Sequence, residues 1–396
     1  GPGRMIAVDL TEGRLYHDRE IKDMLAAEQP YQEWVRNITE FVHAPGADGD
    51  LPAQFDGEAL RRRQRAAGYS LEDLELILAP MIEDAKEATG SMGDDTPLAV
   101  LSQGYRGLHH YFRQQFSQVT NPPIDSLRES RVMSLNTRLG NLTNVLDEDA
   151  SQTDILLLSS PVLTNADFID MRERMGDSAA GIDCGFAADG DENALRDAIA
   201  RIRREAEDAV RGGSVHLILD DSHIGEDRAA IPMILAAGAV HAHLVRNGLR
   251  TYTSLNIRSA ECLDVHYFAV LIGVGATTVN AYLAQESIHD RHRRGLVGGL
   301  SLEDAVARYK RAVDQGLLKI MSKIGIAIIS SYRGGYNFEA IGLSRALVAD
   351  IFPGMPSRIS GIGLAGIQRK VLEKHGKAYG DDDAPLPVGG LYRYRT

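Results

Sequence analysis

The fold is decided by the stretch Val215-His-Leu-Ile-Leu-Asp220, a short apolar run that predicts a buried strand. Two similar runs precede it, at residues 154–159 and 181–186. Apolar residues at helical spacing follow these runs, at 192–211 and 229–247. Strands that alternate with helices predict parallel pairing with helices over the faces of the sheet. The predicted fold class is therefore α/β.

The alternation continues toward the C-terminus. It predicts a strand at 251–257, a helix at 264–272 and a short strand at 276–280. A long helix capped by Ser301 is expected to end at Gly325, and a last strand is expected at 326–330. A parallel-sheet βα architecture of this kind fits either a modified or incomplete β/α barrel or an open doubly wound sheet.

The first part of the chain predicts an N-terminal helical region. Residues 5–16 form a candidate hairpin, and helical patterns follow at 18–28, 30–38 and 60–67. Ser70-Leu-Glu-Asp73 resembles a capping box that opens a further helix to about residue 89.

Composition excludes several classes of protein. A chain of 396 residues can bury a sizeable core, and its net charge of −12 disfavours binding to nucleic acid or to anionic membranes. The longest apolar stretch, 267–279, is too short to span a membrane. With only Cys184 and Cys262 there is no disulfide framework, which fits a cytoplasmic setting.

Two proline-containing loops are the most unusual stretches: Met92-Gly-Asp-Asp-Thr-Pro97 and Val119-Thr-Asn-Pro-Pro-Ile-Asp125. Prolines remove N–H donors and hold the preceding residue extended. Such loops present carbonyls and few donors. They suit contact with another domain or with a small neutral donor such as ammonia, and they do not suit acid–base chemistry.

Both loops resemble the central domain of the glutamate synthase family. The likeness continues through 316–325 and 331–342 and ends at 352–358, so it covers nearly the whole chain. The resemblance implies a segment that joins two catalytic domains of the same chain. One is a glutamine amidotransferase domain that releases ammonia, and the other is an FMN-binding barrel that reduces the imine formed from 2-oxoglutarate.

The resemblance also implies a division of the chain. Residues 1–40 would be the tail of the amidotransferase domain and a connector, 41–150 a mainly helical part, 151–378 the α/β part, and 379–396 a linker into the FMN-binding domain. FMN and an iron–sulfur cluster are expected in the parent subunit and no cofactor in this segment. A small electron-donor subunit or ferredoxin would be a further partner.

No catalytic, cofactor-binding or metal-binding residue is expected in this segment. Family knowledge implies that the ammonia passage is entered past Met92, Thr120 and Asn121. Met92 would act as a flexible apolar gate, and Thr120 and Asn121 would contribute carbonyls. A water-poor passage keeps ammonia from gaining a proton and from escaping.

Two other functions remain open. Asp220-Asp221-Ser222-His223 follows the clearest strand, where ligand sites of parallel sheets gather, so the chain could be an independent β/α-barrel-like enzyme. In the simpler interpretation, these residues form a polar loop that ends the strand and caps the next helix. The other function is a purely structural interaction scaffold without a passage.

The remaining motifs favour structural roles. His241 and His243 diverge at i,i+2 spacing, and Cys184 has no local base, so scattered histidines and a buried thiol are expected. Gly361-Ile-Gly-Leu-Ala-Gly366 matches a dinucleotide fingerprint, but a loop is expected before it. Arg61-Arg-Arg-Gln-Arg65 is a candidate solvated or salt-bridged helix face, and Tyr332-Arg-Gly-Gly-Tyr336 is either a packed turn or a phosphate or flavin contact.

Overall fold

A parallel sheet lies at the centre of the protein. The computed structural model describes residues 3–55, 57–88, 98–102, 107–115, 128, 131–335, 337–380 and 385–390. In these residues the central sheet has five strands in the order β7–β13–β12–β10–β8, all parallel. Their bounds are β7 Val162–Leu163, β8 Ala179–Asp183, β10 His216–Asp220, β12 Ser254–Arg258 and β13 Thr278–Asn280.

The middle strand β10 is buried along its whole length, as its apolar sequence predicts. Leu217 and Leu219 pack into the main core, whereas Ile218 points to the other face and joins a second apolar cluster with Phe168 and Met171. Because both faces are covered, the strand carries no alternation of apolar and polar residues.

The strand order favours the incomplete barrel over the doubly wound sheet. β8, β10, β12 and β13 are neighbours in chain order, and β7, the first of the five, lies beside β13, the last. This is the order of a β/α barrel that is open between β7 and β8, which are not paired in the described part of the chain. The α/β prediction is confirmed.

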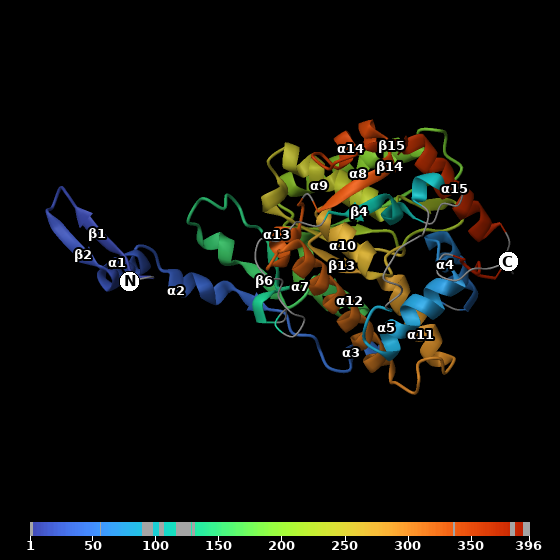
Figure 1. The fold of residues 1–396 in the computed structure, drawn as a ribbon, viewed down its shortest axis with the longest axis horizontal. Coiled ribbons are helices and arrows are strands. Elements are labelled where there is room, and N and C mark those ends of the chain that lie inside the picture. Colours follow the sequence, from blue (N-terminus) through green and yellow to red (C-terminus); the bar gives the residue numbers. More distant parts are fainter. Residues whose placement is uncertain are drawn as a thin grey trace.

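Helices surround the sheet (Figure 1). α9 and α10 are apolar on nearly every side and buried, whereas α8 buries one face only. The bounds are α7 Asn165–Met175, α8 Ala194–Arg211, α9 Met233–Arg246, α10 Val265–Gly273, α11 Tyr282–Arg293 and α12 Leu302–Ile324. As expected, Ser301 caps α12 through the amide of Asp304, and Gly325 ends it with φ +81°.

Smaller sheets and helices complete the body. β14 pairs in parallel with β15 and antiparallel with β4, and β6 pairs with β3 and β5. β9 pairs antiparallel with β11. The strands are β3 Thr39–Glu40, β4 Phe112–Gln114, β5 Thr137–Gly140, β6 Ile155–Leu158, β9 Gly185–Ala187, β11 Arg228–Ala230, β14 Phe338–Leu343 and β15 Ile359–Ile362. The helices are α3 Ala47–Asp50, α4 Gly57–Ala67, α5 Ala79–Glu83, α13 Ile329–Tyr332, α14 Arg345–Ile351 and α15 Leu364–Tyr379.

Residues 3–34 form an arm that projects away from the body (Figure 1). It consists of the predicted hairpin, β1 (Ile6–Asp9) with β2 (Arg14–His17), followed by α1 (Asp18–Ala27) and α2 (Tyr31–Trp34). None of the residues of α1 or α2 is buried. The arm therefore contributes little to the core of the described structure.

Three expectations are corrected. The strand expected at 326–330 is wrong: Ile328 makes only an isolated bridge to Ser134, and residues 329–332 form α13. The run at 154–159 does form a strand, but it lies in a small sheet outside the central one.

The helix expected after Ser70 also differs. The capping pair is present, since the amide of Asp73 donates to Ser70 Oγ at 3.2 Å. The segment then winds as a π-helix, η2 (Asp73–Leu78), and α5 ends at Glu83 rather than near residue 89. The proposed division of the chain into domains stays a prediction. No described helix is long and apolar enough to cross a membrane.

Candidate functional site

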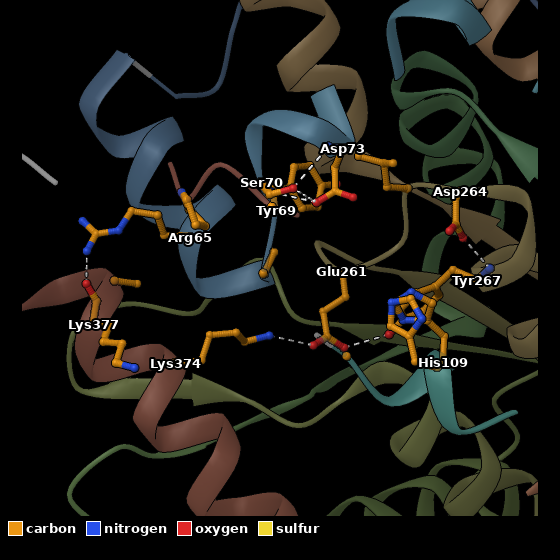
Figure 2. A pocket seen from close by; sticks show the side chains of 18 of the residues that line it. Arg65, Tyr69, Ser70, Asp73, His109, Glu261, Asp264, Tyr267, Lys374 and Lys377 are labelled. Atoms are coloured by element: carbon orange, nitrogen blue, oxygen red, sulfur yellow. Dashed lines mark hydrogen bonds and ion pairs between the residues drawn. The ribbon is translucent and has the colours of Figure 1, made fainter. Parts of the chain in front are cut away.

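A cavity with a volume of about 390 Å³ lies beyond the carboxyl end of β12 (Figure 2). Its walls come from five places: the end of α4 with the turn after it, the turn at 107–110, the loop after β12, the C-terminal half of α15, and residues 385–389. Segments distant in sequence thus meet at the edge of the parallel sheet where ligand sites gather.

Glu261 is the best-fixed charged group of this cavity. Its side chain is 7% exposed and forms an ion pair with Lys374 at 3.3 Å. The hydroxyl of Tyr267 donates to Glu261 Oε2 at 2.7 Å, and the amide of Met233 lies 3.3 Å from the same oxygen. Figure 2 shows Lys374 reaching Glu261 from α15, on the opposite wall. The carboxylate therefore joins α15, α9 and α10.

His109 is the buried histidine of the cavity. Burial, and secondarily the neighbouring His110, lowers the pKa of His109 well below its ordinary value, so the ring is neutral at neutral pH. It packs against the ring of Tyr267 with centroids 4.8 Å apart. Its Nδ1 atom is buried and has no hydrogen-bond partner among the described residues.

The C-terminal segment 385–390 closes one side of the cavity. The amides of Leu71 and Glu72 donate to the carbonyls of Pro387 and Val388 at 2.8 and 3.1 Å. The amide of Gly390 donates to Glu72 Oε2 at 2.7 Å. Residues 387–390, part of the predicted linker, are therefore fixed to Leu71 and Glu72 just before η2.

Charges of both signs line the cavity, and they decide what it can do. Besides Glu261 and Lys374 it contains Arg65, Asp73 and Lys377. Such walls suit a polar chain segment or a small charged molecule. They do not suit a water-poor passage for ammonia, because charged side chains hold water around them. We therefore do not assign the passage to this cavity.

The predicted passage residues Met92, Thr120 and Asn121 lie outside the described residues. Their roles stay predictions.

The loop Asp220–His223 uses its acids for internal contacts. Both oxygens of Asp221 accept the amide of Ala260, at 2.9 and 3.0 Å, and burial raises the pKa of Asp221 well above its ordinary value. Asp220 accepts from the amide of Ser222 at 2.7 Å and pairs with Arg258 at 3.4 Å. His223 is exposed. These contacts indicate that the loop holds the end of β12 and the residues after it in place. They do not suit an acid–base centre.

The other histidine and cysteine candidates are not brought together as a metal site. His241 accepts from Arg250 Nε at 3.1 Å, whereas His243 pairs with Glu207 at 2.6 Å. Cys184 and Cys262 are buried reduced thiols, and burial raises the pKa of both well above the ordinary value, which makes them poor nucleophiles.

The glycine fingerprint corrects one expectation, because a strand and not a loop precedes it. β15 runs directly into α15 at Gly363. Close packing accounts for two of the glycines: a Cβ at Gly361 would collide with the backbone of Gly342, and one at Gly366 with the side chain of Ile362. The motif therefore has a packing explanation.

The arginines of the motifs at 61–65 and 332–336 make contacts within the chain itself. Arg63 donates to the carbonyl of Ser222 at 3.0 Å and stacks over Phe55. Arg333 donates to the carbonyl of Ala276 at 3.2 Å, and Gly334 has φ +68°, as in a tight turn. A flavin contact at the second motif stays untested.

Sequence reasoning missed Glu261, Lys374 and His109. Glu261 comes four residues after the strand predicted at 251–257, and this position is the signal that could have found it. Lys374 had no such signal, because it lies 113 residues further along the chain.

Comparison with known proteins identifies the family. The model of the glutamate synthase central domain matches residues 62–344, more than two thirds of the chain. The chain belongs to the glutamate synthase central domain family. The model of class-II glutamine amidotransferases matches residues 1–34, and the described part of this range, 3–34, forms the projecting arm.

Relatives extend over the whole chain. The large chain of glutamate synthase [NADPH] from Azospirillum brasilense is 67% identical over 398 residues, and that from Bacillus subtilis 39%. The chloroplastic ferredoxin-dependent glutamate synthase of Spinacia oleracea is 38% identical over 408 residues. Each match covers 100% of this chain but only 25 or 26% of the relative, so the chain spans about a quarter of their length. A solved mutant flavocytochrome b2 overlaps 69% of this chain and 82% of its own chain, at a TM-score of 0.35 and 9% identity.

Proposed function

We propose that this segment connects the two reaction centres of a glutamate synthase large chain. It would couple glutamine hydrolysis to the reductive amination of 2-oxoglutarate, help to enclose the ammonia passage, and hold no complete active site of its own. The match of residues 62–344 to the central-domain family carries this proposal, and the amidotransferase match at residues 1–34 supports it.

The exposed surface of the arm supports the proposal that an amidotransferase domain lies next to it. Ile6, Val8 and Leu10 of its hairpin are 71%, 59% and 90% exposed. Apolar side chains clustered on a small hairpin are typical of a surface that another domain covers. A two-stranded hairpin is also only marginally stable by itself in water.

The parent chain would carry FMN and an iron–sulfur cluster outside this segment, and it would work in the cytoplasm. Relatives are named for NADPH or for ferredoxin, so either a small electron-donor subunit or ferredoxin fits as the electron source. Neither nucleic acid nor a membrane belongs to this function.

The passage is tested by Thr120→Trp in the complete large chain, with Thr120→Val as the control that keeps the size of the side chain. Blocking the passage should leave glutamine hydrolysis in place while conversion of 2-oxoglutarate falls, so more glutamine is consumed per 2-oxoglutarate converted. Ammonium added to the solution should restore part of the conversion. An unchanged ratio in a folded Thr120→Trp enzyme would refute the passage at this position.

A further inference from the structure

The connector between the arm and the body contains a histidine with a carboxylate beside each ring nitrogen. His43 lies between β3 and α3, and its Nδ1 atom is 2.7 Å from Oδ1 of Asp167, which is 4% exposed. Donation of the Nδ1 proton to this carboxylate leaves the lone pair on Nε2. A carboxylate behind a histidine is the arrangement that orients histidines for binding a metal.

The Nε2 atom faces two further carboxylates. It lies 3.3 Å from Oε1 of Glu303, at the start of α12, and 3.8 Å from Oδ2 of Asp48, in α3. One ligand atom from each of the three residues lies within 4.8 Å of the others. A small contraction would bring all three to about 2.0–2.2 Å from a common centre.

Backbone donors hold both carboxylates in place. Glu303 accepts the amides of Gly46 and Gly49 at 3.1 and 3.0 Å, and Asp48 accepts the amide of Ala166 at 3.1 Å. Each oxygen has a second lone pair, so these bonds leave room for a cation.

More acidic than basic side chains surround His43, Asp48 and Glu303. Asp314 is a further carboxyl, and Asp167 is one of the charged groups close enough to act on it. Lys310, 3.6 Å from Asp167, is the basic group that pairs with it. A bound divalent cation would offset the remaining charge.

A small cavity borders Asp48. Its volume is about 30 Å³, enough for one water, and its walls include Asp48, Glu286 and His289. The Nδ1 atom of His289 is buried without a hydrogen-bond partner in the described part of the chain. The cavity therefore offers room for a water beside Asp48, one of the three carboxylate and imidazole groups.

We propose that His43, Asp48 and Glu303 form a divalent-cation site, of the kind that Zn²⁺ occupies with an open water position. One imidazole and two carboxylates are a ligand set that this ion accepts. The ion would fasten the connector to the N-terminus of α12. It would thereby hold the arm, with the neighbouring domain that the arm carries, at a fixed place on the body.

The test measures zinc in the complete large chain. The wild type, His43→Gln and Glu303→Gln are dialysed against micromolar Zn²⁺, and zinc per chain is measured by mass spectrometry. His223→Gln, at an exposed histidine outside the cluster, is the matched control. The wild type and His223→Gln should retain one zinc more than the two ligand variants, whose zinc affinity at this site should fall at least ~10-fold.

Two further readouts separate metal binding from a merely structural role. Zn²⁺ should slow protease cleavage of residues 41–55 in the wild type, and a chelator should reverse the effect. Zinc-soaked crystals of the wild type should give an anomalous peak about 2.0–2.2 Å from His43 Nε2.

Equal zinc content in all four proteins, or no anomalous peak in the soaked wild type, would overturn the proposal. His43 would then be a protonated bridge between carboxylates.

Discussion

Replacing Gly389 by alanine should release the C-terminal segment from the cavity. Gly389 has φ +110°, and an added Cβ would lie 2.7 Å from Oε2 and 2.9 Å from Cβ of Glu72. Gly390 provides the matched control: it has φ +91°, but a Cβ there would meet nothing within 4 Å. Both substitutions strain the backbone, and only Gly389→Ala also collides with Glu72.

The structure allows the free-energy cost of Gly389→Ala to be compared with the free energy that docks the segment. An L-residue in such a conformation costs about 1–3 kcal/mol, and overpacking costs about 1–3 kcal/mol more. Docking of the segment rests on three hydrogen bonds of about 1 kcal/mol each and on burial of Leu386, worth about 1.5–3 kcal/mol. The entropy of ordering the segment offsets part of this gain. The segment should therefore undock in Gly389→Ala before the body unfolds.

Hydrogen exchange of the Leu71 and Glu72 amides is the direct assay, because these amides donate to the segment. Exchange should be roughly 10-fold or more faster in Gly389→Ala than in Gly390→Ala, since each 1.4 kcal/mol changes the opening equilibrium tenfold. Equal exchange in the two variants would refute the steric argument. Faster exchange throughout the body in Gly389→Ala would refute local undocking.

Two other predictions concern stability. Burial lowers the pKa of His216 to about 4, so the unfolded chain binds its proton first as the pH falls. Stability should therefore drop below pH 6.5 by up to about 3 kcal/mol, and a chemical-denaturation series on His216→Gln should show a flatter pH slope; an unchanged slope would contradict this assignment. In α9, a Cβ at Gly238 would collide with the ring of Phe352, so Gly238→Ala should cost about 1–3 kcal/mol. Gly376 in α15 has open space, so Gly376→Ala should stabilise by about 0.5–1 kcal/mol, and melting temperatures that move the same way in both variants would disprove the packing argument.

The α/β architecture could be predicted because four of the five strands of the central sheet, all but β7, have a signal in their own residues. β10 is apolar at consecutive positions and is buried on both faces. α8 repeats its apolar residues at helical spacing because one face packs on the sheet. Both patterns follow from burial alone and need no knowledge of distant residues.

Pairing between strands could not be predicted in the same way. The run at 154–159 has the same apolar character as β10, yet it forms β6 in a separate small sheet. Residues 326–330 are equally β-like, but the chain turns into α13 there and buries Ile329 and Tyr332. A short apolar run predicts burial, and tertiary contacts decide its conformation.

The pairs of charged residues could not be predicted from the sequence, because their members lie far apart along the chain. His43 and Glu303 are 260 residues apart, and Glu261 and Lys374 are 113 apart. No spacing rule connects such residues. The acids that spacing did single out, Asp220 and Asp221, face internal partners instead.

These two kinds of acid are connected in the structure. Asp221 holds the amide of Ala260 with both oxygens, and the next residue is Glu261, which pairs with Lys374 across the cavity. Since Asp221 is buried and Glu261 faces the cavity, the acid after β10 fixes the loop that presents the acid after β12. The polar residues at the end of the clearest strand therefore do bear on the cavity. Asp221 acts by positioning the carboxylate of Glu261. The sequence pattern therefore pointed to the acids after β10, whereas the carboxylate in the cavity follows the neighbouring strand β12.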